Sequence, residues 1–389
     1  MKIHLKYFNM EIKIVLGLNF GDEGKGMVVQ NLCKQALAEN KRVLVVRFSG
    51  GPQAAHTVIN NGVSHVCSTY GSGCLLNVPT LWIGYETAID PITFFNEKKI
   101  LNQKGFDPEI MFACDINTIT PYDVLFNQSD EKSLKDGTCG KGVFAAHSRL
   151  RLPLCQCGNS PYLNDKLSYI KTHYGNITLS HSLQYKFIRA CEKIQHYITY
   201  DAINIIRQYD VVILEGSQGL LLDPHHSMFR PHVTATSLLS FPVLDSNTEF
   251  YLVSRSYLTR HGNGYEPIKC DDFYDLSDKY ETNVLNEFQG EFKTGVLSLD
   301  LMNRILDRID LAAYNHGKFN LVITHMDIPF EQNKFMFELG RSVQSFKDLN
   351  IEVTPYNICD FIKNKLYLEF DNVYYTNSPT SSLHLCQTF

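Results

Sequence analysis

The chain has 389 residues, of which 44% are hydrophobic and 20% are charged, so it can bury the core of one large domain or two ordinary ones. Its net charge of -5 argues against general nucleic-acid binding, which favours basic patches. No apolar stretch approaches the ~20 residues needed to span a bilayer, and the first ten residues lack the apolar core of a signal peptide. We therefore expect a cytoplasmic protein, acting away from membranes and nucleic acids, whose partners are small molecules or other proteins.

Four apolar segments predict buried strands, and a glycine-rich loop follows the first of them. Residues 12–20 (IKIVLGLNF) lead into that loop, and from about Lys25 apolar residues recur at helical spacing before a second strand at 41–48 (KRVLVVRF). Strand, loop, helix and strand form a βαβ unit, whose strands are parallel. Residues 210–219 (DVVILEGSQG) and 319–327 (FNLVITHMD) repeat the pattern of an apolar strand that ends in polar groups.

These segments predict a single α/β domain over residues 1–389, built around a mostly parallel central sheet with loop insertions. The chain contains no low-complexity linker and no repeat that would divide it. Ligands of such sheets bind at the carboxyl ends of the strands. The polar strand ends are therefore expected to share one crevice, with a P-loop-like nucleotide site in the first loop.

Eleven cysteines are scattered along the chain, and we expect them to be reduced. Cys155 and Cys157 could form half of a metal site, but no matching second pair is evident. Two ordinary thiols are the simpler interpretation.

The first loop, GLNFGDEGKG at residues 17–26, departs from the P-loop pattern G-x-x-x-x-G-K-[ST]. Asn19 stands in place of the first glycine, and Gly26 replaces the hydroxyl residue that usually binds Mg²⁺. The loop can still hold phosphate, because its glycines free the backbone N–H groups, the helix N-terminus is partly positive and Lys25 supplies a charge. Asp22 can replace the missing hydroxyl as a metal ligand or can accept a proton. The competing interpretation is an ordinary helix N-terminus with acids in its first turn.

A second candidate is His56, in RFSGGPQAAHTV at residues 47–58. It follows the second strand, on the side where the first loop lies. A histidine that changes charge near neutral pH suits a general acid, although a lone histidine is often structural.

Together these motifs resemble the adenylosuccinate synthetase family, in which G-x-x-W-G-D-E-G-K-G precedes R-[YF]-x-G-G-x-N-A-G-H-T. Further blocks follow in the order of the family, and they are STYGSGCLLN (68–77), GTCGKG (137–142), EGSQGLLLD (215–223), HVTAT (232–236), YLTRHGNG (257–264) and THMD (324–327). The resemblance implies a homodimeric ligase of purine biosynthesis that joins L-aspartate to C6 of IMP. GTP and Mg²⁺ would serve a 6-phosphoryl intermediate.

The resemblance also assigns roles to single residues. The catalytic residues would be Asp22, which takes the N1 proton and binds Mg²⁺ with the Ala55 carbonyl, His56 as general acid, and Lys25. Glu23 would have the plainer role of favouring the helix N-terminus. The nucleotide-binding set would be Asn19, Gly21, Glu23, Gly24, Gly26, His325, Asp327 and Ser378. The substrate-binding set would be Gln53, Thr138, Cys139, Arg149 or Arg151 from the neighbouring subunit, Gln218, Leu222, Thr234, Lys293 and Thr294.

The chain departs from the family where aspartate should bind. The common enzyme has an arginine-rich loop there, whereas residues 286–300 (NEFQGEFKTGVLSLD) contain no arginine and offer only Lys293 and Thr294. This stretch resembles the short archaeal and phage branch of the family, some of whose phage members act on dGMP, with ATP or GTP. A retained Asp22 favours IMP over that alternative.

Two interpretations from other classes remain open at this point. A kinase or GTPase would explain the glycine loop and Asp327, but it would not need aspartate. A binding protein derived from the enzyme would bind nucleotides without turnover.

Overall fold

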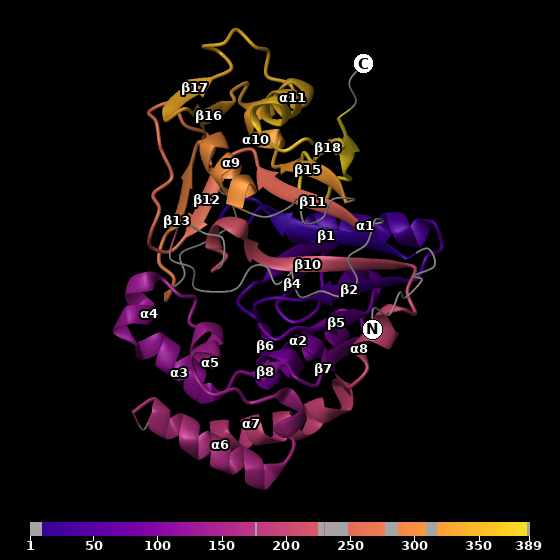
Figure 1. Ribbon diagram of the computed structural model, residues 1–389, viewed down its shortest axis with the longest axis vertical. Coiled ribbons are helices and arrows are strands. Elements are labelled where there is room, and N and C mark those ends of the chain that lie inside the picture. The colour runs from indigo at the N-terminus through magenta and orange to yellow at the C-terminus, as the bar shows by residue number, and fades with distance from the viewer. Residues whose placement is uncertain are drawn as a thin grey trace, which may run out of the picture.

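The computed structural model describes residues 10–386 apart from residues 176, 225–228, 230–247, 277–286 and 309–316. Within these residues the central sheet has the strand order β19-β18-β15-β11-β1-β10-β2-β5-β7-β9 (Figure 1). Every described pair in it is parallel except β18 with β19. Its strands are β1 (Glu11–Gly17), β2 (Val43–Arg47), β5 (Thr80–Trp82), β7 (Ile110–Ala113), β9 (Ile198–Thr199), β10 (Val211–Gly219), β11 (Thr248–Arg255), β15 (Lys318–Thr324), β18 (Asn372–Tyr375) and β19 (His384–Leu385). The predicted α/β fold with a mostly parallel sheet is confirmed.

The predicted βαβ unit is present, but another strand lies between its two strands. β1 leads through the glycine loop into α1 (Lys25–Ala38), and the chain returns in β2. β1 and β2 are not neighbours, because β10 pairs with both. The carboxyl ends of all three strands therefore lie together at one edge of the sheet, which is where the candidate residues were expected.

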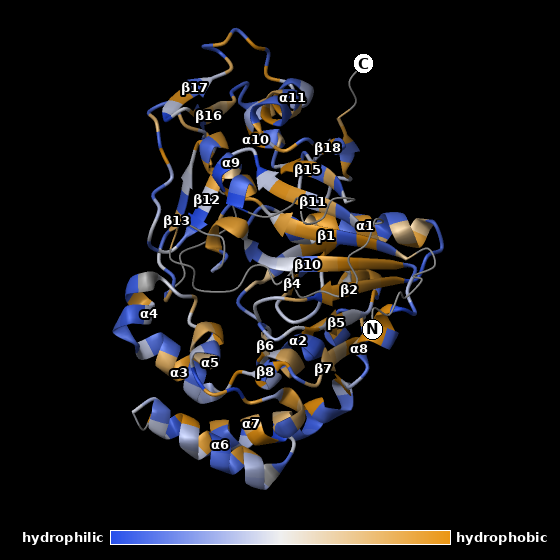
Figure 2. Ribbon diagram, in the orientation of Figure 1, coloured by the Kyte–Doolittle hydropathy of each residue, from blue (hydrophilic) through white to orange (hydrophobic). Residues whose placement is uncertain are grey.

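Both faces of the sheet are covered, which explains why its central strands are almost continuously apolar (Figure 2). On one face Val28 and Leu32 of α1 pack with Val15 and Val45 of the strands. The other face belongs to a larger core that includes α9 (Leu299–Arg308) and α11 (Pro355–Lys365). Burial on both sides makes the sheet a rigid frame for its loops.

Helices beyond the β2 side of the sheet form a second region, at the bottom of Figure 1. They are α2 (Pro91–Gln103), α3 (Pro121–Ser129), α4 (Glu131–Asp136), α5 (Val143–Ser148), α6 (Ser160–His173), α7 (His181–Ile194) and α8 (Ala202–Ile206). Local sequence fixes where several of them begin. Thr120 and Asp123 form a capping box around α3, and proline occupies the first helical position of α3 and α2.

Shorter elements complete the described chain. The pairs of strands outside the main sheet are β3 (His56–Asn60) with β4 (Val63–Cys67), β6 (Ala88–Ile89) with β8 (Asn117–Thr118), and β12 (Leu258–His261) with β13 (Phe292–Gly295); β14 (Leu297–Ser298), β16 (Met336–Leu339) and β17 (Ser342–Ser345) form a small sheet. The remaining helical segments are α10 (Asp327–Glu331) and the 3-10 turns η1 (Cys74–Leu76), η2 (Leu154–Gln156), η3 (Gln195–Tyr197) and η4 (Leu220–Leu222). None of the described helices combines the length and the apolar character that a membrane-spanning segment requires.

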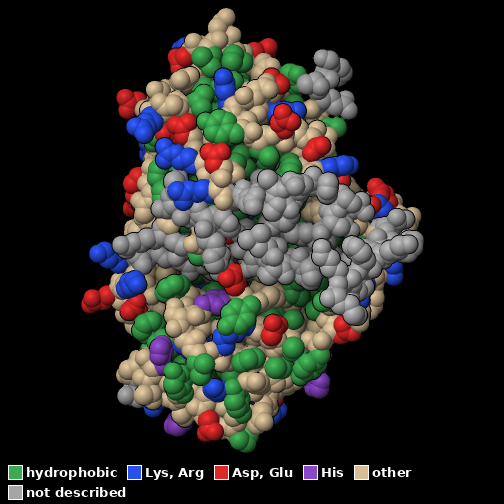
Figure 3. Space-filling model, in the orientation of Figure 1, with side chains coloured by type: hydrophobic (Ala, Val, Ile, Leu, Met, Phe, Trp, Pro, Cys, Tyr) green, Lys and Arg blue, Asp and Glu red, His purple; other side chains and the backbone are tan. Residues whose placement is uncertain are grey.

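The described surface carries charges of both signs. On the face drawn in Figure 3, acidic and basic side chains are interspersed. All eleven cysteines lie in the described part and are free thiols, and the Cys157 thiol donates to the Leu154 carbonyl at 2.9 Å.

Candidate active site

The loop between β1 and α1 turns through left-handed backbone conformations. The φ angles are 106° at Gly21, 58° at Asp22 and 86° at Gly24. A positive φ is ordinary for glycine but uncommon for aspartate, and residues held in such conformations cluster at functional sites. Asp22 is one of eight described non-glycine residues with a positive φ, and it shares this conformation with His325 at the end of β15.

Glu23 has a different role from the one expected of it. Its Oε1 accepts hydrogen bonds from the backbone N–H of Asn19 at 3.1 Å and of Gly21 at 2.8 Å, and Lys25 Nζ donates to Oε2 at 2.6 Å. α1 begins only at Lys25 and has no acid in its first turn. The prediction that Glu23 favours the helix N-terminus is therefore wrong, because the left-handed residues on either side turn its carboxylate back into the loop.

Gly17 is needed for this arrangement. A Cβ atom at Gly17 would lie 2.3–2.6 Å from the carboxyl group of Glu23. Glu23 and Lys25 are 1% and 2% exposed, so this is a buried ion pair inside the loop. It fixes the loop's shape and occupies two of the N–H groups that could otherwise face phosphate.

The Asp22 carboxylate lies against His261 at the end of β12. His261 Nε2 is 2.6 Å from Asp22 Oδ2, and Arg255 donates to the Asp22 carbonyl. Burial raises the pKa of Asp22, but the hydrogen bond and charge of His261, with the charges of Arg255 and Lys25, lower it to about 2. Asp22 is consequently ionised at neutral pH and can accept a proton or bind a hard cation.

His56 is held by a buried carboxylate. Its Nδ1 contacts Oε1 of Glu215 on β10, and Glu215, at 0% exposure, also accepts hydrogen bonds from the backbone and hydroxyl of Ser72. Burial lowers the pKa of His56, with Arg47 and Lys25 acting the same way, while Glu215 raises it. A carboxylate on one ring nitrogen orients the imidazole and leaves Nε2 for a reacting group, as in other acid–base dyads.

Arg47, the last residue of β2, holds the turn that carries His56. Arg47 stacks on Trp82 with its Cζ 4.8 Å from the ring centroid, and its Nη2 donates to the Ala54 carbonyl at 3.2 Å. A Cβ atom on Gly26 would lie 2.7 Å from the Cβ of His56. Because α1 starts in contact with His56, the loop of Asp22 and the turn of His56 are neighbouring walls of one site.

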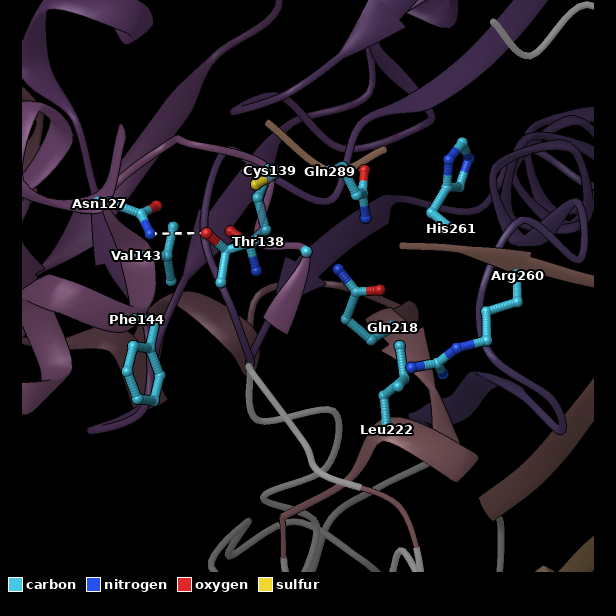
Figure 4. A pocket seen from close by; sticks show the side chains of 12 residues that line it. Asn127, Thr138, Cys139, Val143, Phe144, Gln218, Leu222, Arg260, His261 and Gln289 are labelled. Atoms are coloured by element: carbon cyan, nitrogen blue, oxygen red, sulfur yellow. Dashed lines mark hydrogen bonds between the residues drawn. The ribbon is translucent and has the colours of Figure 1, made fainter. Parts of the chain in front are cut away.

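Five predicted substrate-binding residues line a single pocket in this region (Figure 4). These are Gln53, Thr138, Cys139, Gln218 and Leu222. The pocket reaches the glycine loop, since a Cβ on Gly21 would lie 3.4 Å from Gln218 Oε1. Asn127 Nδ2 donates to the Thr138 hydroxyl at 2.7 Å and so orients it.

Several buried polar atoms of the residues that line the pocket have no hydrogen-bond partner in the described part of the chain. They are both amide atoms of Gln53, Nδ1 of His261, and Nε and Nη1 of Arg260. Leaving a buried donor or acceptor unpaired costs about 1–3 kcal/mol. Several such atoms around one cavity indicate a polar ligand that completes them.

The predicted base-binding residues lie at the end of β15, beside the glycine loop. Thr324 donates to the Glu23 carbonyl at 2.8 Å, and His325 follows with a φ of 58°. Burial, with the charge of Arg255, holds the pKa of His325 well below its usual value. Asp327 opens α10, and Ser378 lies in the turn after β18, where the Thr376 carbonyl accepts from the Met326 N–H at 3.0 Å. His325, Asp327 and Ser378 are thus brought to one side of the loop.

Arg149 and Arg151, the two alternatives expected to reach a neighbouring subunit, have different surroundings. Arg149 forms a buried ion pair with Asp123 at 2.6 Å and donates to the Thr118 carbonyl at 2.8 Å, which fixes it inside the helical region. Arg151 stacks on Tyr85, with its Cζ 3.6 Å from the ring centroid, and donates to the carbonyls of Tyr85 and Asp115.

On β13, Lys293 pairs with Glu266, and Thr294 lies opposite Thr259 of β12. Neither residue lines the pocket. Ala55 is exposed in the turn before β3. Thr234 lies outside the described residues.

Sequence reasoning did not assign a role to four residues of the site. Glu215, Ser72, Arg260 and His261 all fall in blocks that match the family's motifs. Glu215 lies at the end of an apolar strand, a position that could have indicated it. The contacts of Arg260 and His261 depend on how β12 meets the first loop, which no local pattern encodes.

The fold and the site are those of a nucleotide-binding α/β protein in which an aspartate and a carboxylate-bound histidine adjoin one glycine loop. Comparison with known proteins gives the family. The family model described as adenylosuccinate synthetase matches residues 14–295. The chain belongs to the adenylosuccinate synthetase family, and it is therefore a ligase that forms a C–N bond between L-aspartate and a purine nucleotide.

Individual relatives agree with this assignment. The chain is 26% identical to the adenylosuccinate synthetase of Buchnera aphidicola over 385 residues, covering 90% of this chain and 86% of the relative. The enzyme of Acetivibrio thermocellus is 27% identical over 352 residues, covering 82% and 78%.

Two solved structures share the fold. The fully ligated adenylosuccinate synthetase of Plasmodium falciparum has a TM-score of 0.73 at 17% identity, over 96% of this chain and 98% of that chain. The succinoaminodeoxyadenylate synthetase of cyanophage S-2L, bound to dGMP and dATP, has a TM-score of 0.62 at 15% identity, over 98% and 97%.

Proposed function

We propose that the enzyme condenses L-aspartate with IMP, uses GTP and Mg²⁺, and acts as a homodimer. The observation that carries the proposal is that two groups meet at the glycine loop: Asp22, which contacts the pocket residue His261, and the His56–Glu215 dyad, which adjoins the start of α1. An activated phosphoryl acceptor needs a base on one side and a cationic or acidic group on the other, and the site supplies both.

The proton that must leave the purine determines the role that we assign to Asp22. Asp22 removes the proton from N1 of the purine, and the electrons released make O6 nucleophilic toward the γ-phosphate of the triphosphate. With a pKa of about 2, Asp22 is in its basic form at neutral pH but is a weak base. We therefore expect Asp22 to take the N1 proton in the same step in which O6 attacks the γ-phosphorus.

His56 acts on the other side of the reaction. Glu215 occupies Nδ1, so Nε2 is the nitrogen that can donate a hydrogen bond or a proton to the transferring phosphoryl group. In the second step the aspartate amine attacks C6, the C6–O6 bond breaks, and O6 leaves as part of inorganic phosphate. Lys25 adds a positive charge to the loop, although its ammonium group is paired with Glu23.

Asp22 and Ala55 are the residues that would hold a magnesium ion. Asp22 offers a carboxylate oxygen and Ala55 a backbone carbonyl, and oxygen ligands beside phosphates are what Mg²⁺ prefers. The ion would neutralise charge between the phosphates during transfer. For the nucleotides, Gln218 and Thr138 are suited to the acceptor, and Asp327 and His325 to the base of GTP. Arg151 is our candidate for the residue that reaches the partner subunit.

The test is phosphate release by the purified protein with Mg²⁺ and aspartate, comparing IMP with dGMP and GTP with ATP. We expect release that requires both IMP and aspartate and is faster with GTP. Turnover with dGMP alone would overturn the choice of IMP. Release without aspartate would favour a simple phosphotransferase, and binding without release would favour a protein that only binds nucleotides.

A further inference from the structure

Arg260, in β12, is a buried cation that forms no salt bridge with any described residue. It is 4% exposed, and its guanidinium Cζ lies 4.6 Å from the centroid of the Phe20 ring. Nη2 donates to the Asn263 carbonyl, whereas Nε and Nη1 have no partner among the described residues. A guanidinium is costly to bury without an anion. Its free donors therefore point to an anionic ligand.

The position of Arg260 in the pocket narrows the choice of anion. Figure 4 shows Arg260 and His261 at one side of the cavity, Asn127, Thr138 and Cys139 at the other, and Gln218 between them. The Thr138 side is where we expect the phosphate of the acceptor nucleotide. Arg260 therefore lies toward the opposite end, next in sequence to the histidine that contacts Asp22.

This end of the pocket is where the amino-acid substrate must bind if the proposed function holds. Asp22 is assigned to N1 of the purine, and N1 is bonded to C6, the atom that the amine of the amino acid attacks. His261, which touches Asp22, therefore adjoins the reacting amine. The carboxylates of aspartate are only a few bonds from that amine and fall within reach of the same strand.

Lys293, the cation expected here from the sequence, is less suitable. It lies directly opposite Arg260 in the β12–β13 pair. Its ammonium group, however, is already paired with Glu266, and it does not line the pocket. The same ladder thus presents two cations, of which only Arg260 directs unpaired donors into the cavity.

We propose that Arg260 is the carboxylate anchor for L-aspartate and takes over the task of the arginine-rich loop that this chain lacks. The assignment rests on the proposed function. A guanidinium can hold a carboxylate through two parallel N–H donors, which a lysine cannot do. In this chain the amino-acid site is therefore built on a strand of the described framework, beside the catalytic base.

The test measures KM for aspartate and for the nucleotide separately in Arg260→Met, Arg260→Lys and Lys293→Met. We expect Arg260→Met to raise the aspartate KM by about 30-fold or more, as for truncation of a buried charged partner, and to change the nucleotide KM by less than about twofold. Arg260→Lys keeps the charge but loses the fork, and should raise the aspartate KM to an intermediate value. Arg189→Met, at an exposed arginine of α7 that pairs with Glu192, is the matched control.

The outcomes separate this inference from the proposed function. If Arg260→Met does not fold, Arg260→Lys decides by the same two constants. A larger rise of the nucleotide KM than of the aspartate KM would overturn the assignment, as would a larger aspartate effect in Lys293→Met than in Arg260→Lys. Wild-type protein that releases no phosphate in response to aspartate would refute the proposed function, and this assignment with it.

Discussion

Replacing Glu215 with glutamine tests whether His56 works only because a buried carboxylate holds it. The change keeps the shape of the side chain but removes its charge. Glu215 accepts one hydrogen bond from His56 and two from Ser72. Burial raises the pKa of Glu215, but His56, Arg47 and Ser72 together lower it to about 2. The substitution removes the group that raises the pKa of His56.

The structure sets the expected size of the effect. Losing an oriented general acid costs about 10²–10⁴ in rate, so Glu215→Gln should lower kcat by about 100-fold or more and change the substrate KM values little. A carboxyl group with a pKa of about 2 when folded and 4.5 when unfolded contributes about 3 kcal/mol at neutral pH. Because the folded pKa is depressed, this stability is complete above pH 4.5 and is lost as the pH falls toward 2.

Two assays follow from this. Steady-state kinetics of Glu215→Gln, His56→Ala and the double variant should show that the double variant is no slower than His56→Ala, because the two residues act as a unit. Acid unfolding followed by fluorescence should lose part of its dependence between pH 4.5 and 2 in Glu215→Gln. A kcat within threefold of wild type, or fully additive rate losses in the double variant, would refute the dyad.

Three further substitutions probe other contacts. Gly17→Ala places a methyl group against the Glu23 carboxyl, so melting temperature and nucleotide affinity should both fall; unchanged values would contradict the ion pair inside the loop. His261→Leu removes the main group that lowers the pKa of Asp22 from 3.8 to about 2, so the acid limb of kcat/KM should move to higher pH, and an unmoved limb would show that Asp22 is not the titrating base. Arg149→Met leaves the buried Asp123 carboxylate without its cation and should lower the free energy of unfolding by about 3–5 kcal/mol in denaturant titrations; a variant as stable as wild type would show that the pair is dispensable.

The strands of the central sheet were predictable where they are buried on both faces. β1, β2, β10 and β15 read as apolar runs with polar ends, and they lie where the pattern placed them. β11, TEFYLVSR, has the same pattern of an apolar run with polar ends, but the sequence analysis did not assign it. The insertion of β10 between β1 and β2 was also not predictable, since it depends on pairing between segments far apart in the chain.

Some features of the site were likewise predictable from the sequence, and others were not. Gln53, Thr138, Gln218 and Leu222 meet in one pocket, as their motifs implied. The role of Glu23 depended on the left-handed φ of its neighbour, which the letters of the sequence do not show. Arg149 is held by Asp123, so its burial follows from the packing of α3 and not from its own motif.

The central claim is that O6 of the purine becomes bonded to phosphorus before aspartate displaces it. It is tested most directly with IMP labelled at O6 with ¹⁸O, in the presence of GTP, Mg²⁺ and aspartate, by mass spectrometry of the released phosphate. The account predicts that each phosphate released with adduct formation carries the label, because the C6–O6 bond breaks and O6 leaves on phosphorus. Unlabelled phosphate would mean that the triphosphate is hydrolysed by water and that Asp22 and His56 do not serve phosphoryl transfer to the purine.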